Sequence, residues 1–506
     1  MIWGKLMNIR IKVGTVEKES AEILAFYLYE DLPIADDMLT YCDNALHNIV
    51  SELIKKKEFV AKLNKTLILP TYGKIPAKRI MLVGLGKKKE VTLDKVRQAA
   101  GTTASIVYDI GIGEVTSVID SIDMPASPEW YQAYTEGCLL ALYTFQKYKY
   151  VLPEEKKELK TITLLLSHKE TSKPAQEGVK HGQIIADAVC FTRDLINTPA
   201  QDKTPTILAN TAKKLAGETG VHCKIVSTPE LKKLGMGGIL GVSQGSNQPP
   251  KLIILEYNIH AKNQDTIIFV GKGITFDSGG ICIKPAKDMD QMKSDMSGAA
   301  AVMGAMKAIS KMRLPQRIIG LIPCTENMPG SSAIKPGDIV KFYSGKTAEV
   351  VNTDAEGRLI LADALGYAED YKPDAVIDLA TLTGSCVVAL GTIATGMAGN
   401  NEELKKRIRI AGEKSWERVW ELPLWDEYQE YIKSDIADIK NTGGPHAGAI
   451  TAACFLSKFT EKYPWVHLDI AGTSWCDKNT AYTRKGASGV GVRLLIQLIQ
   501  DWTRFS

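Results

Sequence analysis

The feature that most constrains the fold of this chain is a series of short, continuously apolar segments separated by stretches with helical periodicity. In the C-terminal two-thirds the helical stretches include Ser297 to Met312 and Arg358 to Tyr371. Strands that are apolar on both faces are typical of parallel sheets covered by helices on both sides. The pattern therefore predicts an α/β fold with a mostly parallel central sheet. The predicted strands are Cys223 to Ser227, Lys251 to Tyr257, Thr266 to Val270, Arg317 to Pro323, Ala375 to Leu379 and Trp465 to Ile470.

The N-terminal third shows a similar alternation and is predicted to form a separate, smaller α/β domain. A chain of 506 residues has room for several domains, because one domain takes roughly 150 residues. A polar stretch from Lys169 to Gly178 interrupts the apolar pattern. We therefore expect an N-terminal domain over residues 1–170, with a regulatory or oligomerisation role, and a larger domain over residues 171–506. The N-terminal strands are predicted at Ile9 to Val13, Thr66 to Pro70, Arg79 to Gly86 and Thr161 to Ser167.

The charge balance argues against a nucleic-acid partner. The 62 basic and 58 acidic residues leave a formal net charge of +4, which is small for this length.

The nine cysteines include no CxxC pair, and this pattern is typical of reduced thiols. The first seven residues lack the basic start and apolar core of a signal peptide, and no apolar run approaches the roughly 20 residues of a membrane span. We expect a cytoplasmic protein without a membrane partner.

The first residues that could take part in catalysis or binding lie in the run from Val270 to Gly280, which follows a predicted apolar strand. It places Lys272, Asp277 and four glycines in a predicted loop, where glycine lets the backbone approach a ligand closely. A phosphate-binding loop is the obvious alternative. The Walker spacing is absent and no GxGxxG opens a helix here, so nucleotide binding is disfavoured.

Three further carboxylates follow at Asp295, Asp354 and Glu356. Taken alone, Asp295 can be a first-turn acid that stabilises the following helix, and the other two can be a surface pair. In extended backbone, however, residues two apart project to one side. With Asp277 they form four carboxylates near predicted strand ends, a set suited to two hard or borderline divalent cations.

A centre with two cations favours amide hydrolysis, because paired cations activate water and polarise a carbonyl group. Other hydrolytic chemistries have no support in the sequence. The seven histidines are isolated, with no HExxH, and there is neither a GxSxG sequence nor a catalytic cysteine motif. Oxygen ligands should therefore dominate the site.

The run Asn352-Thr353-Asp354-Ala355-Glu356-Gly357-Arg358-Leu359 resembles the signature octapeptide of the leucyl aminopeptidase (cytosol aminopeptidase) family. Several shorter motifs reinforce the resemblance, which covers roughly Arg193 to the C-terminus. They are Val270-Gly271-Lys272-Gly273, Phe276-Asp277-Ser278-Gly279-Gly280, Lys284-Pro285, Asp295-Met296, Asn327-Met328-Pro329 and His467-Leu468-Asp469-Ile470-Ala471-Gly472.

The resemblance implies a catalytic metallopeptidase domain with two divalent metal ions, Mn or Zn, with Mg or Co also suited. The tightly held metal would be bound by Lys272, Asp277, Asp295 and Glu356. The more exchangeable metal would be bound by Asp277, Asp354 and Glu356. A lysine ligand has to be neutral, so the cations would have to lower the pKa of Lys272 strongly.

The resemblance also implies catalytic roles for Arg358 and Lys284. Arg358 would hold a bicarbonate ion that acts as the general base, and protonated Lys284 would hydrogen-bond the scissile carbonyl. The substrates would be peptides whose free α-amine binds the tightly held metal and Asp295. The side-chain pocket for leucine-like residues would be lined by Met292, Thr381, Gly384 and Ala471.

At the level of the whole protein, the resemblance implies a homohexamer of two trimers. An alternative function is that of a DNA-binding or regulatory protein of the same family, with or without peptidase activity. A basic stripe on the N-terminal domain would favour it, and the net charge of +4 gives it little support.

Overall fold

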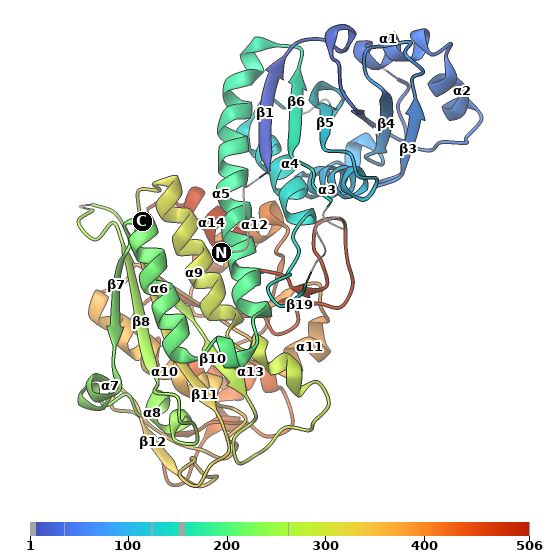
Figure 1. Cartoon of the computed structure of the whole chain (residues 1–506). Coiled ribbons are helices and arrows are strands. Elements are labelled where there is room, and N and C mark those ends of the chain that lie inside the picture. The colour runs from blue at the N-terminus through green and yellow to red at the C-terminus, as the bar shows by residue number, and fades with distance from the viewer. Residues whose placement is uncertain (1–6, 35, 123–124, 151–156, 262, 505–506) are drawn as a thin grey trace. The chain divides into compact units, whose positions relative to one another are not determined.

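The computed structural model describes residues 7–34, 36–122, 125–150, 157–261 and 263–504, and its chain divides into two compact units (Figure 1). The first unit comprises Met1–Ala186 with Lys478–Arg484, and the second Asp187–Asp477 with Lys485–Ser506. The passage between them lies within helix α5, Ser172–Asn197. Residues 1–6, which contribute to the expectation about a signal peptide, lie outside the described residues. Among those that are described, no helix is both long and apolar enough to cross a membrane.

The first unit is built on one six-stranded sheet in which every neighbouring pair is parallel except the pair at one edge, β3 with β4. Its helices include α1 (Asp37–Ala45), α2 (Ile49–Lys55), α3 (Leu93–Asp109) and α4 (Pro128–Ala141). The predicted α/β pattern of this part of the chain is confirmed. In spatial order the strands are β1 (Asn8–Val13), β6 (Thr161–Leu166), β5 (Glu114–Val118), β2 (Leu24–Leu28), β4 (Arg79–Gly84) and β3 (Thr66–Pro70).

A segment from near the C-terminus belongs to this first unit. Tyr482 donates its hydroxyl to Asp94 Oδ1 over 2.5 Å. Arg484 donates its Nε–H to the carbonyl oxygen of Ala141 over 2.7 Å and an Nη2–H to the hydroxyl of Ser105 over 3.0 Å. Residues 478–484 therefore complete a unit whose other residues all lie before residue 187.

The second unit has a nine-stranded sheet whose central strands are parallel, as predicted. Antiparallel pairing is confined to β15 with β18, β11 with β8, and β8 with β7. In spatial order the strands are β16 (Val419–Glu421), β15 (Thr395–Gly399), β18 (Trp465–Asp469), β14 (Ala375–Ala380), β9 (Thr266–Gly271), β11 (Arg317–Asn327), β8 (Lys251–Tyr257) and β7 (His222–Val226), and β10 (Gly273–Asp277) pairs with β11.

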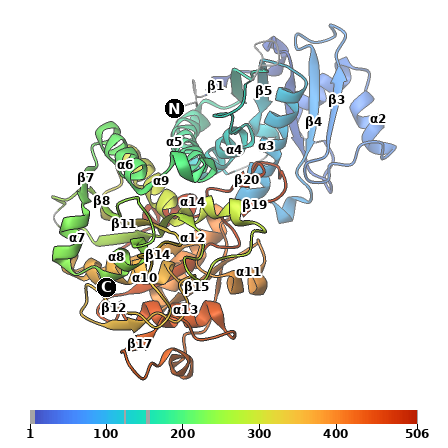
Figure 2. The ribbon, with the colours of Figure 1, turned by 60° about the horizontal axis from the view of Figure 1, so that its bottom comes forward.

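Helices cover both faces of this sheet (Figures 1 and 2). One face carries α6 (Pro205–Thr219), α9 (Ser297–Met312) and, packed on α9, α14 (Val492–Gln500); α12 (Glu402–Ser415) packs on α14. The other carries α8 (Gly237–Ser243), α10 (Gly357–Ala368) and α13 (Gly448–Ser457). Because both faces are covered, all six residues of β9 are buried, which explains its continuously apolar sequence.

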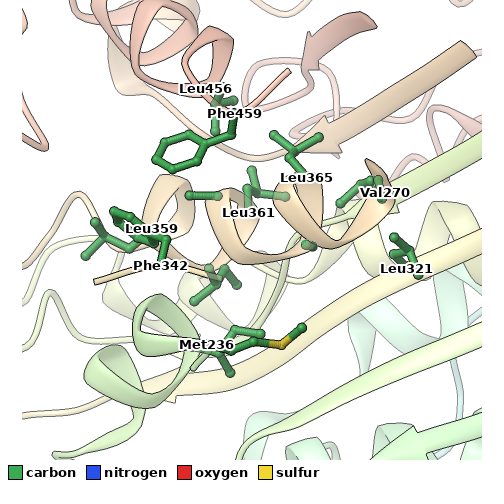
Figure 3. Packing of buried hydrophobic residues seen from close by; sticks show 14 of the residues in the cluster. Met236, Val270, Leu321, Phe342, Leu359, Leu361, Leu365, Leu456 and Phe459 are labelled. Atoms are coloured by element: carbon green, nitrogen blue, oxygen red, sulfur yellow. The ribbon is translucent and has the colours of Figure 1, made fainter. Parts of the chain in front are cut away.

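The core between the sheet and the helices α8, α10 and α13 is centred on α10. Leu361 and Leu365 of this helix belong to a buried cluster with Val270 of β9 and with Phe459, which follows α13. Figure 3 shows these side chains together. Burial of this kind stabilises the fold by roughly 1.5–3 kcal/mol for each large apolar side chain. It also fixes the start of α10, where the signature octapeptide lies.

Two local predictions were wrong. The glycine-rich run after β9 is not wholly a loop, because Gly273–Asp277 forms strand β10. Asp354 and Glu356 do not lie in extended backbone: Asp354 is in a turn, and Glu356 has helical dihedral angles, φ −80° and ψ −35°, as the N-cap of α10. Helix α10 begins at Gly357, directly after Glu356, so the two carboxylates are brought together by a turn and a helix start.

Candidate active site

The predicted site residues lie where strands of the second unit end. Lys272 directly follows β9, Asp277 is the last residue of β10, and Thr381 directly follows β14. The carboxyl ends of parallel strands meet at one edge of a sheet, the usual position of a functional site in open α/β folds. The sheet topology therefore gathers side chains that are more than 100 residues apart in sequence.

Lys272 lies at the centre of the first group of charges. Its ammonium nitrogen is 2.8 Å from Asp295 Oδ1 and 2.9 Å from Glu356 Oε1, and it donates to the carbonyl oxygen of Thr381 over 2.8 Å. All three charged side chains are buried. Asp295 Oδ1 also accepts from the hydroxyl of Thr381 over 2.8 Å. The second carboxylate oxygen of Asp295 is buried without a hydrogen-bond partner, so it is open to a further ligand.

A second group of charges adjoins the first. Lys284 Nζ is 3.0 Å from Asp277 Oδ2 and 2.5 Å from Asp354 Oδ1. The other oxygen of Asp277 accepts from the backbone amide of Gly279 over 2.9 Å and from the side-chain amide of Asn327 over 2.8 Å. Asp277 is therefore held in one orientation by a backbone and a side-chain donor.

Three carboxylates of these groups converge closely enough to share a cation. Asp277, Asp354 and Glu356 each offer an oxygen, and these oxygens all lie within 4.8 Å of one another. Like charges at this separation repel strongly when they are buried. A set of this kind is suited to hard divalent cations, which take oxygen ligands.

The carboxylates determine the charge state of the two lysines. Burial lowers the pKa of Lys272, but Asp295, Glu356 and Asp277 outweigh burial and hold that pKa above its ordinary value. The pKa of Lys284 is raised in the same way by its acidic neighbours. Conversely, burial and the charges of Asp277 and Glu356 raise the pKa of Asp354 to about 6. Within this cluster of protein groups alone, both lysines are ammonium ions.

Arg358 lies in the first turn of α10 and is buried. Its Nη1 donates to the carbonyl oxygen of Asn441 over 2.8 Å, while its Nε–H is buried without a partner. Burial lowers the pKa of Arg358 to about 10, against the opposing effects of Glu356 and Asp469. The guanidinium therefore retains donor capacity for an oxyanion.

The remaining predicted residues lie on neighbouring loops. Met292 belongs to the 3₁₀ helix Met289–Ser294, which ends next to Asp295, and Gly384 begins α11 (Gly384–Leu390). Ala471 follows β18 and donates its amide to Asp469 Oδ1 over 3.1 Å. The same carboxylate accepts from Leu382 over 3.1 Å and Thr383 over 2.7 Å, so Asp469 ties the loop after β14 to the loop after β18.

One residue that organises the site was not predicted from the sequence. Asn441 is fully buried, and its Oδ1 accepts from the amide of Val351 over 2.8 Å while its Nδ2 donates to the carbonyl oxygen of Asn352 over 2.7 Å. Asn327 stands in one of the motifs that carry the resemblance, but its role was not apparent: besides Asp277, it binds the carbonyl oxygen of Thr353 over 3.0 Å. Two buried amides therefore hold the turn that carries Asp354.

Comparisons with known proteins agree with this arrangement. Residues 190–496 match the family described as "Cytosol aminopeptidase family, catalytic domain", and residues 23–150 match "Cytosol aminopeptidase family, N-terminal domain". The "Probable cytosol aminopeptidase" of Geotalea uraniireducens is 47% identical over 90% of this chain and 92% of its own length. The "Cytosol aminopeptidase" of Pseudomonas aeruginosa is 45% identical over 91% of this chain and 92% of its own length.

A solved structure is also similar. The "Bottromycin maturation enzyme BotP in complex with Mn" superposes with a TM-score of 0.83 at 31% identity, covering 95% of this chain and 99% of that one. The fold, the strand-end site and these matches define a metallo-exopeptidase. The chain belongs to the cytosol aminopeptidase family, and its activity is that of an aminopeptidase.

Proposed function

We propose that this aminopeptidase removes the N-terminal residue of peptides, preferably leucine or another apolar residue, at a centre of two divalent cations. The observation that carries the proposal is the convergence of Asp277, Asp354 and Glu356, whose ligand oxygens lie within 4.8 Å of one another. The unpartnered Oδ2 of buried Asp295 supports a further bond to a cation on the same side.

In this proposal Lys272, Asp277, Asp295 and Glu356 hold the tighter cation, and Asp277, Asp354 and Glu356 hold the exchangeable one. When bound, the two cations supply Lewis-acid polarisation and an activated water. Lys272 has to give up a proton to act as a ligand. The cations would therefore have to lower its pKa, which its three acidic neighbours raise. The manganese named for the bottromycin enzyme supports Mn as one metal, with Zn, Mg or Co as the other candidates.

Lys284 acts on the scissile carbonyl of the substrate, and Arg358 acts through the general base. As an ammonium ion beside Asp277 and Asp354, Lys284 donates a hydrogen bond to the scissile carbonyl and to the oxyanion that develops there, a contribution of roughly 3–4 kcal/mol. Arg358 would hold bicarbonate, which would supply the general base. Its buried, unpartnered Nε–H supports this role, because a planar oxyanion can accept from it.

The specificity for apolar side chains comes from Met292, Thr381, Gly384 and Ala471. Gly384 supports such a pocket, since no atom lies within 4 Å of the point where a Cβ would stand. The free α-amine of the substrate would bind the tightly held metal and Asp295, which would explain removal of one terminal residue at a time. A pocket of this kind separates side chains that differ by one methylene by roughly 10–200-fold, so related apolar residues are also accepted.

The proposed setting is the cytoplasm, as the names of the relatives indicate, and the proposed assembly is a homohexamer. Residues 1–170 form the N-terminal domain with a regulatory or oligomerisation role, and residues 171–506 form the catalytic domain. Peptides are the partners that this activity requires.

The test is hydrolysis of leucine p-nitroanilide by the purified protein after chelation and after addition of Mn or Zn. The matched control is the N-acetylated substrate, which lacks the free amine. We expect metal-restored cleavage of the free-amine substrate alone. Equal cleavage of the acetylated substrate, or full activity after exhaustive chelation, would rule out the proposed mechanism.

A further inference from the structure

The first unit contains a cavity of about 610 Å³ that the peptidase site does not use. Its walls come from the segments that directly follow the parallel strands of the six-stranded sheet. Thr15 and Glu17 follow β1, Tyr29 follows β2, Asp120 follows β5, and His168 follows β6. We call this cavity the N-terminal crevice. It lies at the carboxyl ends of the strands, where ligands bind in open α/β sheets.

The topology of the sheet singles out the same place. Strands β2 and β5 are neighbours, but the connections that leave them run in opposite directions. From β2 the chain continues towards β3 and β4 on one side, whereas from β5 it continues to β6 on the other. The strand order therefore reverses between β2 and β5, and a crevice opens at such a switch point. Tyr29 and Asp120, which line the N-terminal crevice, stand at the ends of these two strands.

The polar lining is predominantly acidic. Glu17, Asp36, Asp37 and Asp120 contribute carboxylates, against the ammonium of Lys88. Asp36 caps α1 by accepting from the amide of Leu39 over 2.7 Å. Burial raises the pKa of Asp36, and the charge of Asp120 raises it further. Both carboxylates line the cavity, so a cation held there would be attracted by both charges.

The rest of the lining is apolar and aromatic. Leu28, Ile34 and Met38 are apolar lining residues, and half-buried Tyr29 is an aromatic one. Lys88 Nζ lies 5.8 Å from the centroid of the Tyr29 ring, so the cation over that ring is the protein's own, and a ligand's ammonium would lie at the carboxylates instead. A lining that combines apolar side chains with several carboxylates matches a ligand that has a cationic head and an apolar body.

We propose that the N-terminal crevice binds a small organic cation, a primary ammonium joined to an apolar body, with its ammonium at Asp36 and Asp120 and its body against Tyr29 and the aliphatic wall. The site is separate from the peptidase centre in sequence and in unit, because every lining residue lies before residue 170. A metal ion alone does not fit this lining, since much of it is apolar.

The test is calorimetric titration of the full-length enzyme with phenethylammonium chloride, with uncharged 2-phenylethanol as the matched probe. The variant is Asp120→Asn, which keeps an oxygen to accept from the amide of Ser167 over 2.5 Å. The control variant is Asp109→Asn, which removes an exposed carboxylate at the end of α3, outside the crevice. We expect saturable binding of the ammonium, weakened roughly tenfold by Asp120→Asn and unchanged by Asp109→Asn.

A crystal of the enzyme soaked in 4-bromophenethylammonium locates the ligand independently of any variant. The expected result is anomalous bromine signal in the N-terminal crevice. The inference is overturned if the wild-type enzyme shows no saturable binding, or if the neutral alcohol binds as tightly. It is equally overturned if Asp120→Asn leaves the affinity unchanged, or if bromine appears in the second unit alone.

Discussion

Gly357 lies directly against the side chain of Lys272. A Cβ atom at position 357 would stand 2.5 Å from Cε and 2.8 Å from Nζ of that lysine, closer than non-bonded atoms can approach. Because Gly357 has no side chain, it leaves room for the side chain of Lys272 to reach Asp295 and Glu356. The requirement is steric and does not involve an unusual backbone angle, because this residue is the first of α10.

We predict that Gly357→Ala displaces Lys272 and lowers kcat by at least roughly 100-fold, because a shift of about 1 Å in a catalytic constellation has that cost. Gly217→Ala in α6 is the matched control, since no atom lies within 4 Å of its Cβ position. The measurement is steady-state hydrolysis of leucine p-nitroanilide with thermal unfolding of both variants. Full activity of Gly357→Ala would show that Lys272 is not needed where it lies.

Removal of the Asn441 side chain should damage both stability and activity. Asn441→Ala removes the partners of the part-buried amide of Val351 and carbonyl oxygen of Asn352, a loss of roughly 1–3 kcal/mol in the free energy of unfolding. Asn400→Ala is a matched control, because Asn400 also donates to two carbonyl oxygens, of Thr460 and Tyr463, but does not hold the signature turn. We expect similar destabilisation by denaturant titration and a fall in kcat for Asn441→Ala alone.

Substitutions of Lys284 and Glu356 should have different effects on catalysis and on metal binding. Glu356→Ala removes an oxygen shared by the proposed ligand sets, so metal content and activity should fall together. Lys284→Ala should keep both metals while kcat falls by roughly 10²–10³-fold, because an oxyanion donor is lost. Metal analysis beside kinetics distinguishes the two. A metal-replete, active Glu356→Ala enzyme would contradict the ligand assignment.

A buried lysine outside the proposed metal centre should make the free energy of unfolding rise with pH in the alkaline range. Lys203 is almost fully buried, and its Nζ donates to the carbonyl oxygen of Lys293 over 2.6 Å. Burial, with a smaller effect of Lys293, lowers its pKa from 10.5 to about 7. Between these values the unfolded chain binds more protons than the folded one, so the free energy of unfolding rises with pH.

The measurement is urea unfolding of the wild type and of Lys203→Met at pH 7 and pH 10. The stability of the wild type relative to the variant should increase by roughly 3 kcal/mol over this interval, since one pKa unit corresponds to about 1.4 kcal/mol. A difference that does not depend on pH would mean that Lys203 stays protonated in the folded protein.

Much of the fold of the second unit could be predicted because its strands are buried on both faces. The predicted run Lys251 to Tyr257 coincides with β8, and Ser297 to Met312 coincides with α9. Strand β10 was missed because glycines and polar residues at its ends resemble a loop, although its pairing with β11 makes it a strand. The turn at Asp354 was missed because residues as distant as Asn327 and Asn441 impose it. Local pattern carries no information about such partners.

The segment 478–484 has a consequence for the order in which this protein is made. Domains generally fold from the N-terminus onwards as the chain leaves the ribosome. Here the first unit is complete only when Tyr482 and Arg484 have reached Asp94 and Ala141. The part that is synthesised first therefore stays incomplete until residue 484 has been made, and a nascent chain that stops before residue 478 would present an N-terminal unit that lacks this segment.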